Sequence, residues 1–515
     1  MLAVISLDAV GAPLLGRLLA QGRLPNLAQV RRSGHNVELI EEIAGAAYTT
    51  LYTGRRLADH GVYFPLQWSA ERQRAYPALA LAASAHERDS LFRRLAAHGL
   101  RVLVLDPPEC APHEVERGFL ASGVQFRARV LLPAWARPKA SGRALMRALG
   151  PAVRVDEVFG QPEPRRLLHA RRELIEAPGR LAAAVELLLG QIEFDFVWVT
   201  FAAAHHGGHI LWDPSQVPGL SGDDAAKLDG AIPELYESVD AALGRILARL
   251  PPGSDVMVLS PKGMGPNAAR VDLLPQMLDR ILGRGDQGSR RPASPLWTLR
   301  ACVPVGVRAW AASLLPETWG YTLAGRLETM GRDWKRTRAF APPCAVEGFV
   351  RFNLAGRERL GIVRASDAAA LAEEVEAGLH SFVDMGGESD GASSVARVER
   401  SQDRVGAGER ASELPDLFVH WAQYPAQLIR GVHSSRFGEV LRAGAGTGRT
   451  GNHCPGTWVT LVPARARLAD DIQHPARLED VTATICAAKG VPHGDLPGHP
   501  MLVGEKPGET PPRGP

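Results

Sequence analysis

The chain has 515 residues, enough for one large α/β domain with insertions or for two domains. Its 45% hydrophobic and 22% charged residues are typical of a globular protein and exclude a fibrous or disordered one. A formal net charge of +3 over this length predicts no strong attraction to nucleic acid or to anionic membranes. We therefore expect neither as a partner.

Cysteine usage and the amino terminus predict the compartment. The five cysteines are scattered without CxxC spacing, which favours a reducing environment over a disulfide framework or a thiolate zinc site. The opening "MLAVISLDAV" runs directly into a strand-like segment without a basic region or cleavage site, and no apolar run reaches about 18 residues. We expect a cytoplasmic protein.

Short apolar runs along the chain predict buried strands, and helical periodicity appears between them. In chain order the runs are "LAVISL" at 2–7, "RVLVL" at 101–105, "FDFVWVT" at 194–200, "DVMVLS" at 255–260, "DLFVHW" at 416–421 and "TWVTLV" at 457–462. Continuous apolar strands alternating with helices predict an α/β fold with a mostly parallel central sheet and helices on both faces.

The domain organisation follows from where this pattern breaks. We expect residues 1–284 to form the first part of the core, with a flap at about 107–185, and residues 346–503 to form its second part. Residues 285–345 are Trp-rich and punctuated by Pro, which predicts a cap insertion. The tail at 504–515 lacks apolar residues and is expected to be disordered.

Polar side chains cluster where strands end. Asp8, the "HHGGH" at 205–209 and the "PKG" at 261–263 follow predicted strands, and His453 lies in a Gly-rich loop just before one. Ligands of such sheets bind at the carboxyl ends of the strands. On spacing alone, the H-x-x-x-H of His205 and His209 fits either a metal site or a polar loop, and exposed or hydrogen-bonded histidines are the commoner case.

Several segments together resemble a known family. "VISLDA", "GRLPNLAQVRRSG" and "YTTLYTGRRLADHGVYF" are similar to the opening of the type I phosphodiesterase/nucleotide pyrophosphatase branch of the alkaline phosphatase superfamily. "GFVRFNLAGRERLGIV", "ELPDLFVHW", "GNHCPGTWVTLVP" and "LEDVTATICAAKGVPHGDLPGHPML" resemble its later segments in the same order, from residue 2 to about 503. The resemblance implies an alkaline-phosphatase-like fold in which two zinc-type ions clamp a phosphoryl group.

The resemblance implies that one of the two metal sites is complete. Asp8 stands at the family's first-strand Asp, and His453 at its final His. His209 matches the His of the family's D-x-x-x-H, and His205 occupies its Asp position. We therefore expect His205, His209 and His453 to hold one zinc ion per chain in an open three-His site, and Asp8 to be the metal ligand that remains of the second ion's shell.

The other half of the family's site is altered. Ala44 stands at the nucleophile position, and "SPKG" places Pro261 and Lys262 where two ligands of the second ion belong. The nearest hydroxyls, those of Tyr48, Thr49 and Thr50, belong to the helix after the nucleophile. We expect the second ion to be absent and the Lys262 ammonium to take its place and pair with Asp8; the alternative is a solvent-exposed Lys262.

These positions predict a one-metal, hydrolase-type enzyme. It would act on a small anionic ester or related metabolite through metal-activated water, with Lys262 holding the anionic group, and without a covalent Thr intermediate. The alternatives are a pseudoenzyme that keeps the fold to bind a ligand or partner, and a Lewis-acid tailoring enzyme of a biosynthetic pathway. Substrate and oligomeric state are not predicted.

Three further features are expected to be structural. His60 in "ADHGV" is interpreted as a turn residue, although it matches a family position. Asp106, at the end of a predicted strand, is expected to cap or turn the chain. The basic run at 165–174 has helical spacing and is expected to be a solvated face.

Overall fold

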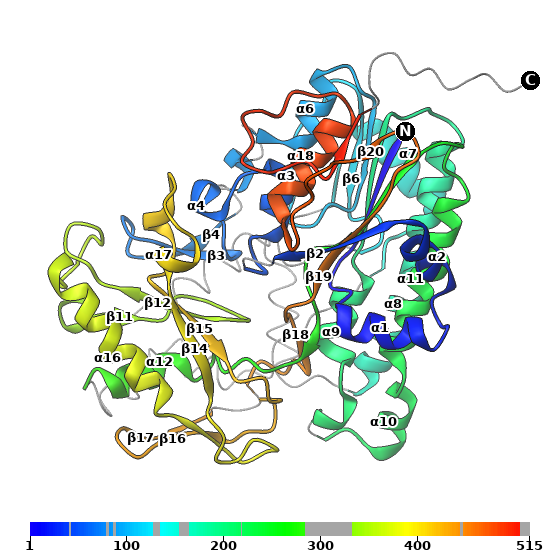
Figure 1. Cartoon of the computed structure of the whole chain (residues 1–515). Coiled ribbons are helices and arrows are strands. Elements are labelled where there is room, and N and C mark those ends of the chain that lie inside the picture. Colours follow the sequence, from blue (N-terminus) through cyan, green and yellow to red (C-terminus); the bar gives the residue numbers. More distant parts are fainter. Residues whose placement is uncertain are drawn as a thin grey trace, which may run out of the picture.

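The computed structural model describes residues 1–40, 43–78, 82–85, 89–126, 134–153, 164–217, 219–283, 332–442 and 446–504. Its largest element is a nine-stranded sheet in the order β21-β2-β19-β9-β1-β8-β5-β6-β7 (Figure 1). The neighbouring strands from β9 to β6 are parallel to each other, whereas β19 is antiparallel to both its neighbours and β7 is antiparallel to β6. The predicted mostly parallel central sheet is confirmed.

The strands of this sheet begin and end close to the predicted apolar runs. In sheet order they are β21 (Ala476–Arg477), β2 (His35–Ile40), β19 (Thr457–Val462), β9 (Asp255–Ser260), β1 (Leu2–Leu7), β8 (Phe196–Phe201), β5 (Val102–Leu105), β6 (Gly118–Ser122) and β7 (Trp135–Arg137).

Helices cover both faces of the central sheet, which explains why its strands are apolar throughout. On β1, Ala3 and Ile5 face one hydrophobic cluster and Leu2 and Val4 face the other, as the two-residue period of a strand requires. The first face packs against α1 (Ala12–Ala20), α2 (Pro25–Ser33), α7 (Lys139–Leu149), α8 (Pro164–Leu189), α9 (Ala203–Leu211), α10 (Gly222–Leu228) and α11 (Ala231–Leu247). The second packs against α3 (Ala47–Thr53), α6 (Leu91–Ala97) and α18 (Leu478–Ala488).

A second lobe with its own core lies beside the central sheet, on the left of Figure 1. It has two antiparallel sheets, ordered β11-β12-β15-β14 and β13-β16-β17. Its elements are α12 (Leu274–Ile281), β11 (Ala339–Phe340), β12 (Gly348–Phe352), α16 (Ala368–His380), β13 (Val383–Met385), β14 (Val395–Arg400), α17 (Ser401–Arg404), β15 (Leu417–Trp421), β16 (Gly431–Ser434) and β17 (Gly438–Leu441).

The prediction that the run at 416–421 belongs to the central parallel sheet is wrong. As β15 it is the inner strand between β12 and β14, and it is antiparallel to both. Leu417 and Val419 face the core of the second lobe, while Phe418 faces a cluster that joins this lobe to α4 (Leu57–His60). Because both faces of β15 are buried, its sequence is apolar throughout, like that of a parallel strand.

The expected division of the chain differs from the structure in two places. The described parts of 107–185 do not form a flap, because β6 and β7 extend the central sheet and α8 packs against its first face. Residues 346–441 form most of the second lobe, and only later segments return to the central sheet as β19, β21 and α18. Most of the proposed cap, and the tail from residue 505, lie outside the described residues.

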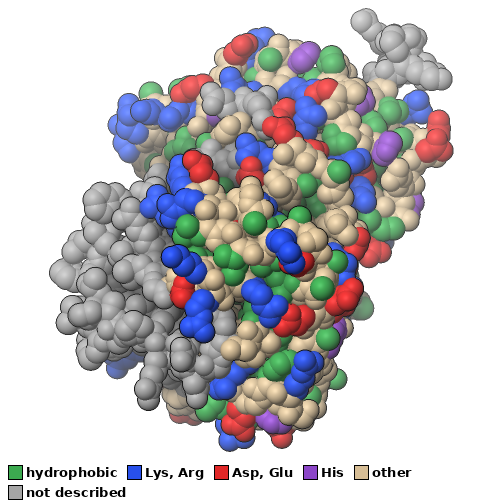
Figure 2. All heavy atoms as spheres, turned by 90° about the vertical axis from the view of Figure 1, so that its left-hand side faces the viewer, with side chains coloured by type: hydrophobic (Ala, Val, Ile, Leu, Met, Phe, Trp, Pro, Cys, Tyr) green, Lys and Arg blue, Asp and Glu red, His purple; other side chains and the backbone are tan. Residues whose placement is uncertain are grey.

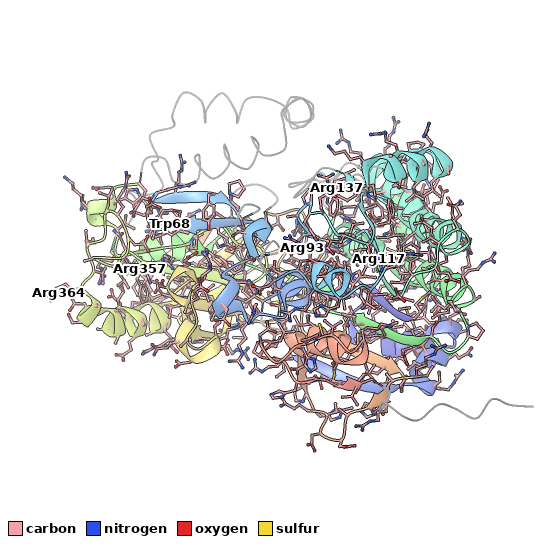
Figure 3. The ribbon with its side chains drawn as sticks, turned by 90° about the horizontal axis from the view of Figure 1, so that it is seen from above. Trp68, Arg93, Arg117, Arg137, Arg357 and Arg364 are labelled. Carbon is pink, nitrogen blue, oxygen red and sulfur yellow. The ribbon has the colours of Figure 1, made fainter. Side chains whose placement is uncertain are left out.

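A hairpin from the first part of the chain reaches the second lobe. β3 (Leu66–Ser69) pairs with β4 (Arg74–Pro77), and Trp68 packs against Phe340 with ring centroids 4.5 Å apart. The indole N–H of Trp68 donates to Glu358 Oε2 at 2.8 Å. Figure 3 accordingly shows Trp68 in the same lobe as Arg357 and Arg364, whereas Arg117 and Arg137 lie in the other.

The remaining elements are short, and the described surface carries mixed charge. They are β10 (Gly265–Pro266), β18 (Gly451–Asn452), β20 (Arg467–Leu468), β22 (Leu502–Val503) and the 3-10 turns Pro214–Gln216, Trp334–Arg336, Ala365–Asp367 and Ala411–Glu413. Basic and acidic side chains are interspersed on the face shown in Figure 2. Among the described residues, no helix combines the length and the apolar character needed to span a membrane.

Candidate metal site

Three histidines meet at the carboxyl end of the central sheet. His205 and His209 lie on α9, which follows β8 directly, and their spacing of four residues places them on one face of the helix. His453 follows β18, which runs beside α9. The ring centroids lie 4.9 Å apart for His205 and His209, 4.8 Å for His205 and His453, and 5.0 Å for His209 and His453. One nitrogen of each ring lies within 4.8 Å of the others, an arrangement that could hold a metal ion.

The "HHGGH" segment is part of a helix and is not the polar loop that its spacing alone allowed. Gly207 and Gly208 are needed for close packing: a Cβ on Gly207 would lie 2.5 Å from Leu235 Cδ2, and one on Gly208 would lie 2.6 Å from Met264 Cγ. Two consecutive glycines therefore let α9 approach α11 and the segment after β9. This approach brings the two helical histidines to His453.

Each of the three rings is held through its Nδ1 atom by an oxygen. His205 Nδ1 lies 2.6 Å from Asp8 Oδ2, His209 Nδ1 lies 3.1 Å from the carbonyl oxygen of Gly451, and His453 Nδ1 lies 3.1 Å from that of Gly263. A carbonyl or carboxylate oxygen only accepts, so Nδ1 carries the proton and Nε2 carries the lone pair of the neutral ring. This arrangement is typical of metal-binding histidines, so the residues present fit a metal ion.

Asp8, which was also expected to be a metal ligand, contacts His205 Nδ1 and is not one of the three residues whose possible ligand atoms lie within 4.8 Å of one another. Its side chain is 1% exposed. The buried Oδ1 atom makes no hydrogen bond of normal geometry with the described residues. Burial acts to raise the pKa of this carboxyl, but the attraction and hydrogen bond of His205, together with the charge of Lys262, hold it below its ordinary value of 3.8. A permanently ionised Asp8 favours the proton on His205 Nδ1.

Burial also acts on His453. It lowers the pKa of this imidazole well below 6.5, and repulsion from Lys262, and from His205 when that ring is protonated, lowers it further. The neutral ring, which is the form that binds metals, is therefore favoured at physiological pH.

Lys262 is buried beside this group and not exposed to solvent. Its side chain is 2% exposed, and its Nζ donates to Glu109 Oε1 at 3.0 Å. The ammonium also lies 4.8 Å from the centre of the Tyr48 ring, within the range of a cation–π contact. Lys262 thus pairs with Glu109 and not, as expected, with Asp8, although its charge does lower the pKa of Asp8.

The turn that carries Lys262 is fixed by specific contacts. The Ser260 hydroxyl lies 2.7 Å from the carbonyl oxygen of Leu7 and 2.9 Å from that of Lys262, and it accepts from the backbone N–H of Val10 at 3.0 Å. A Cβ on Gly263 would lie 2.1 Å from the carbonyl oxygen of Cys454, so the two segments meet backbone to backbone. Pro261, in this turn, has no side-chain atom that could bind a metal.

The nucleophile position carries no reactive group. Ala44 is buried in the turn before α3 and has no side-chain oxygen. Of the nearby hydroxyls, that of Thr50 lies 3.0 Å from His60 Nε2 and that of Tyr48 lies 3.3 Å from the Ser6 hydroxyl. Burial and then the charge of Asp8 raise the pKa of Tyr48 well above 10.0, so its phenol stays protonated.

The three features expected to be structural make packing or solvent contacts in the structure. His60 ends α4, where its Nδ1 accepts from the backbone N–H of Val62 at 3.0 Å. Asp106 accepts backbone N–H groups of Val124 and Gln125, both at 2.7 Å, and so fixes the chain after β5. The charged residues of 165–174 lie on exposed or half-buried positions of α8.

The structure adds contacts around the site that the sequence did not suggest. Glu109 and Tyr48 form the surroundings of Lys262, and the carbonyl oxygens of Gly263 and Gly451 orient two histidines. Glu109 has a positive φ of 58°, uncommon for a residue with a side chain. The "DPPEC" at 106–110, directly after β5, was the available signal, since residues at strand ends form the ligand site of such sheets.

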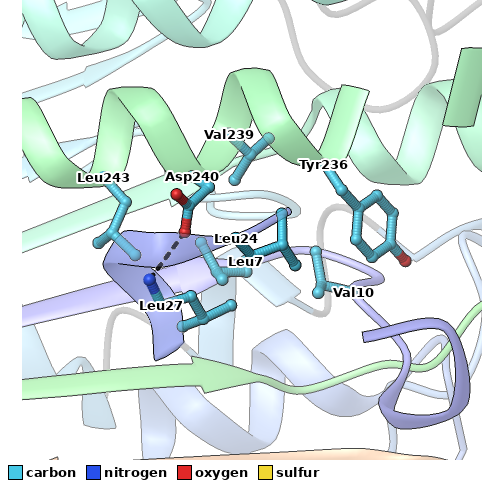
Figure 4. Close-up of a pocket in the computed structure, with 8 residues that line it drawn as sticks. All are labelled: Leu7, Val10, Leu24, Leu27, Tyr236, Val239, Asp240 and Leu243. Carbon is cyan, nitrogen blue, oxygen red and sulfur yellow. Dashed lines mark hydrogen bonds between the residues drawn. The ribbon is translucent and has the colours of Figure 1, made fainter. Parts of the chain in front are cut away.

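A separate small cavity lies among α2, α11 and the end of β1 (Figure 4). It is lined by Leu7, Val10, Leu24, Leu27, Tyr236, Val239, Asp240 and Leu243. Asp240 accepts from the backbone N–H groups of Asn26 and Leu27 and from the Asn26 amide, so it caps the first turn of α2. This cavity is a packing feature of the core and not a substrate site.

Comparison with known proteins supports the family resemblance found in the sequence. The model of the family "Type I phosphodiesterase / nucleotide pyrophosphatase" matches residues 2–294. No curated protein matches the sequence. A phosphonoacetate hydrolase from Sinorhizobium meliloti 1021 shares 13% identity and a TM-score of 0.50, over 93% of this chain and 94% of that one. A murine ectonucleotide pyrophosphatase / phosphodiesterase 5 shares 9% identity and a TM-score of 0.45, over 97% and 96%.

These structural similarities concern the fold alone, because the identities are low. The family match covers more than half of the 515 residues, and it includes Asp8, His205, His209 and Lys262. This chain therefore belongs to the type I phosphodiesterase / nucleotide pyrophosphatase family.

Proposed function

We propose that this protein is a one-zinc hydrolase-type enzyme that acts on a small anionic ester or related metabolite without a covalent Thr intermediate. The observation that carries the proposal is the set of three Nδ1–oxygen contacts, which make Nε2 the ligand atom of His205, His209 and His453, together with the mutual distances of at most 4.8 Å between the possible ligand atoms. A zinc ion held there would supply a Lewis acid with one open position. A small molecule is the expected partner and the cytoplasm the expected compartment.

The other half of the site would bind the anionic group of the substrate. The Lys262 ammonium acts electrostatically on both Asp8 and His453, so it lies close enough to act on a ligand of the three-His group. Burial strengthens its interaction with an incoming charge because little water screens it. Lys262 would thus orient the substrate without supplying an electrophile of its own.

The contacts around Lys262 favour a rebuilt site over a decayed one. In a site that had lost its function, a buried lysine that pairs with a carboxylate and contacts an aromatic ring would not be expected. The turn at 260–263 also still orients His453 through the Gly263 carbonyl. Ala44 is the observation that favours the second candidate, a pseudoenzyme that binds a ligand without turnover.

Metal content is the deciding measurement. Protein purified without added metal should contain close to one zinc ion per chain, and His209→Ala should lose it because only two ligands remain. His206→Ala is the matched control: this ring packs against Phe126 and lies outside the group of three, so zinc should be retained. Fewer than about 0.2 zinc ions per chain in the wild type would contradict the proposal.

Turnover separates the enzyme from the pseudoenzyme. The zinc-containing protein should hydrolyse at least one member of a panel of phosphodiesters, phosphomonoesters and sulfate esters. Lys262→Ala should abolish that activity while zinc stays bound, because the ammonium is not a ligand. A zinc-containing protein without activity on any such ester would favour the binding function.

A further inference from the structure

Glu109 is the counter-ion of Lys262, and its position is specific. The carboxylate accepts from Lys262 Nζ at 3.0 Å, and its side chain is 17% exposed. Glu109 adopts the left-handed backbone conformation, with φ of 58°, in the turn after β5. Such a conformation costs a residue with a side chain about 1 kcal/mol or more, and it persists where the surroundings require it. Here it brings the carboxylate to the buried ammonium.

The pair changes the charge that a ligand meets. With the three imidazoles neutral, as metal binding requires, the charges of the described residues that act on this site are negative on Asp8 and Glu109 and positive on Lys262. The carboxylates thus exceed the ammonium by one charge, and a divalent cation would leave the site with one positive charge. A singly charged anion would neutralise it, whereas a second negative charge would be repelled by Glu109.

We propose that Glu109 is a specificity-determining residue, which by pairing with Lys262 on the Tyr48 ring restricts the site to singly charged oxyanions and excludes doubly charged ones. The proposal deepens the proposed function and rests on it for the presence of the ion. The ion pair between Glu109 and Lys262 forms without a metal ion, and its charge acts on any anion that contacts Lys262 whether or not a metal is bound. Glu109 acts on the ligand through charge and takes no part in bond breaking.

The test uses two probes of similar size and different charge. At pH 8, methyl phosphate is doubly charged and dimethyl phosphate is singly charged. Calorimetric titration of the full chain should show that Glu109→Gln binds methyl phosphate at least about tenfold more tightly than the wild type, because one like charge has been removed. Binding of dimethyl phosphate should change less than about threefold.

Matched variants separate this effect from a general change of the surface. Glu114 lies five residues after Glu109, is 76% exposed and pairs with Arg137. Glu114→Gln removes this exposed carboxylate and should bind both probes as the wild type does. Lys262→Met should weaken the binding of both probes. Glu109→Asn repeats the test with a residue that readily adopts a positive φ, in case the Gln variant folds poorly.

The outcomes distinguish failure of the inference from failure of the proposed function. The titrations are repeated on zinc-depleted protein. There, Glu109→Gln should still bind methyl phosphate more tightly than the wild type does. Equal changes for both probes, or no measurable binding of methyl phosphate to the Gln and Asn variants with or without zinc, would overturn the inference. Absence of zinc from the wild type would contradict only the proposed function.

Discussion

At the scale of single residues, two glycine carbonyls serve the candidate metal site as directly as side chains do. Gly263 and Gly451 each accept the Nδ1 proton of a histidine. Both sites are crowded: a Cβ on Gly451 would lie 2.1 Å from the carbonyl oxygen of Gly208, and one on Gly263 equally close to that of Cys454. Substitution at either position must move backbone and not merely a side chain.

Gly263→Ala is therefore expected to lower zinc affinity at least about tenfold, as loss of an oriented hydrogen bond to a ligand commonly does. Zinc competition with a chelator measures the effect. Gly16→Ala is the control, because this exposed helical glycine has nothing within 4 Å of the new Cβ. It should leave zinc affinity unchanged and stabilise the fold by about 0.5–1 kcal/mol. Equal zinc affinity in both variants would show that the Gly263 carbonyl is dispensable.

The sequence could identify the site residues that lie in recognisable segments but not the contacts between them. Asp8, His209 and His453 were found because they keep their order relative to strands and to the family's motifs. Glu109 was not found, because its role depends on meeting Lys262, 153 positions away. The partner of Lys262 was wrongly predicted for the same reason: burial and pairing are properties of the folded chain.

At the scale of elements, α9 shows how an ambiguous pattern was resolved. Two consecutive glycines disfavour a helix, because each glycine lowers helix propensity by about 1 kcal/mol. The tertiary contacts with Leu235 and Met264 outweigh that preference. The same limit explains β15, whose apolar run could not reveal that the burial on its two faces comes from different clusters.

α18 offers a prediction about pH. Glu479, in its first turn, is 1% exposed, and its nearest cations are 3.8 Å away on Arg56 and 4.0 Å away on Arg477. Burial raises the pKa of this carboxyl above 4.5. The folded state therefore binds more protons than the unfolded state between the two pKa values, and the free energy of unfolding falls as pH rises through that window.

Glu479→Gln removes this titration. The variant should be more stable than the wild type at pH 7 by about 1–3 kcal/mol, the usual cost of a poorly compensated buried polar group, and the difference should shrink towards pH 4. Urea unfolding at several pH values measures it. Glu193→Gln, at an exposed position, should have the same free energy of unfolding as the wild type at every pH. A Gln variant that loses stability at pH 7 would mean that the two arginines compensate the charge fully.

At the scale of the whole molecule, the central sheet and the second lobe have separate cores. The second lobe is held internally by a buried ion pair: Arg270 donates to Asp384 at 2.9 and 2.5 Å, and both side chains are 0% exposed. Ser389 and Ser394 also donate to this carboxylate, at 2.6 and 2.8 Å. All of these bonds lie within the second lobe or the segment that leads into it.

Asp384→Asn should therefore destabilise the second lobe by about 3–5 kcal/mol, because it leaves a buried guanidinium without its counter-charge. Urea unfolding should show the loss, while zinc content in the absence of urea stays that of the wild type. Asp367→Asn breaks an exposed pair with Arg364 and should leave the free energy of unfolding close to that of the wild type. Loss of zinc in Asp384→Asn would instead show that the metal site needs an intact second lobe.

The place of β19 in the central sheet has a consequence for biosynthesis. This strand, at Thr457–Val462, separates β2 from β9 and directly follows His453. While the ribosome is still translating the middle of the message, a nascent chain already contains Asp8, His205 and His209, but neither the third imidazole nor the strand that joins the two parts of the sheet. A metal ion could therefore be held by all three histidines only after His453 and the strand that follows it have left the exit tunnel.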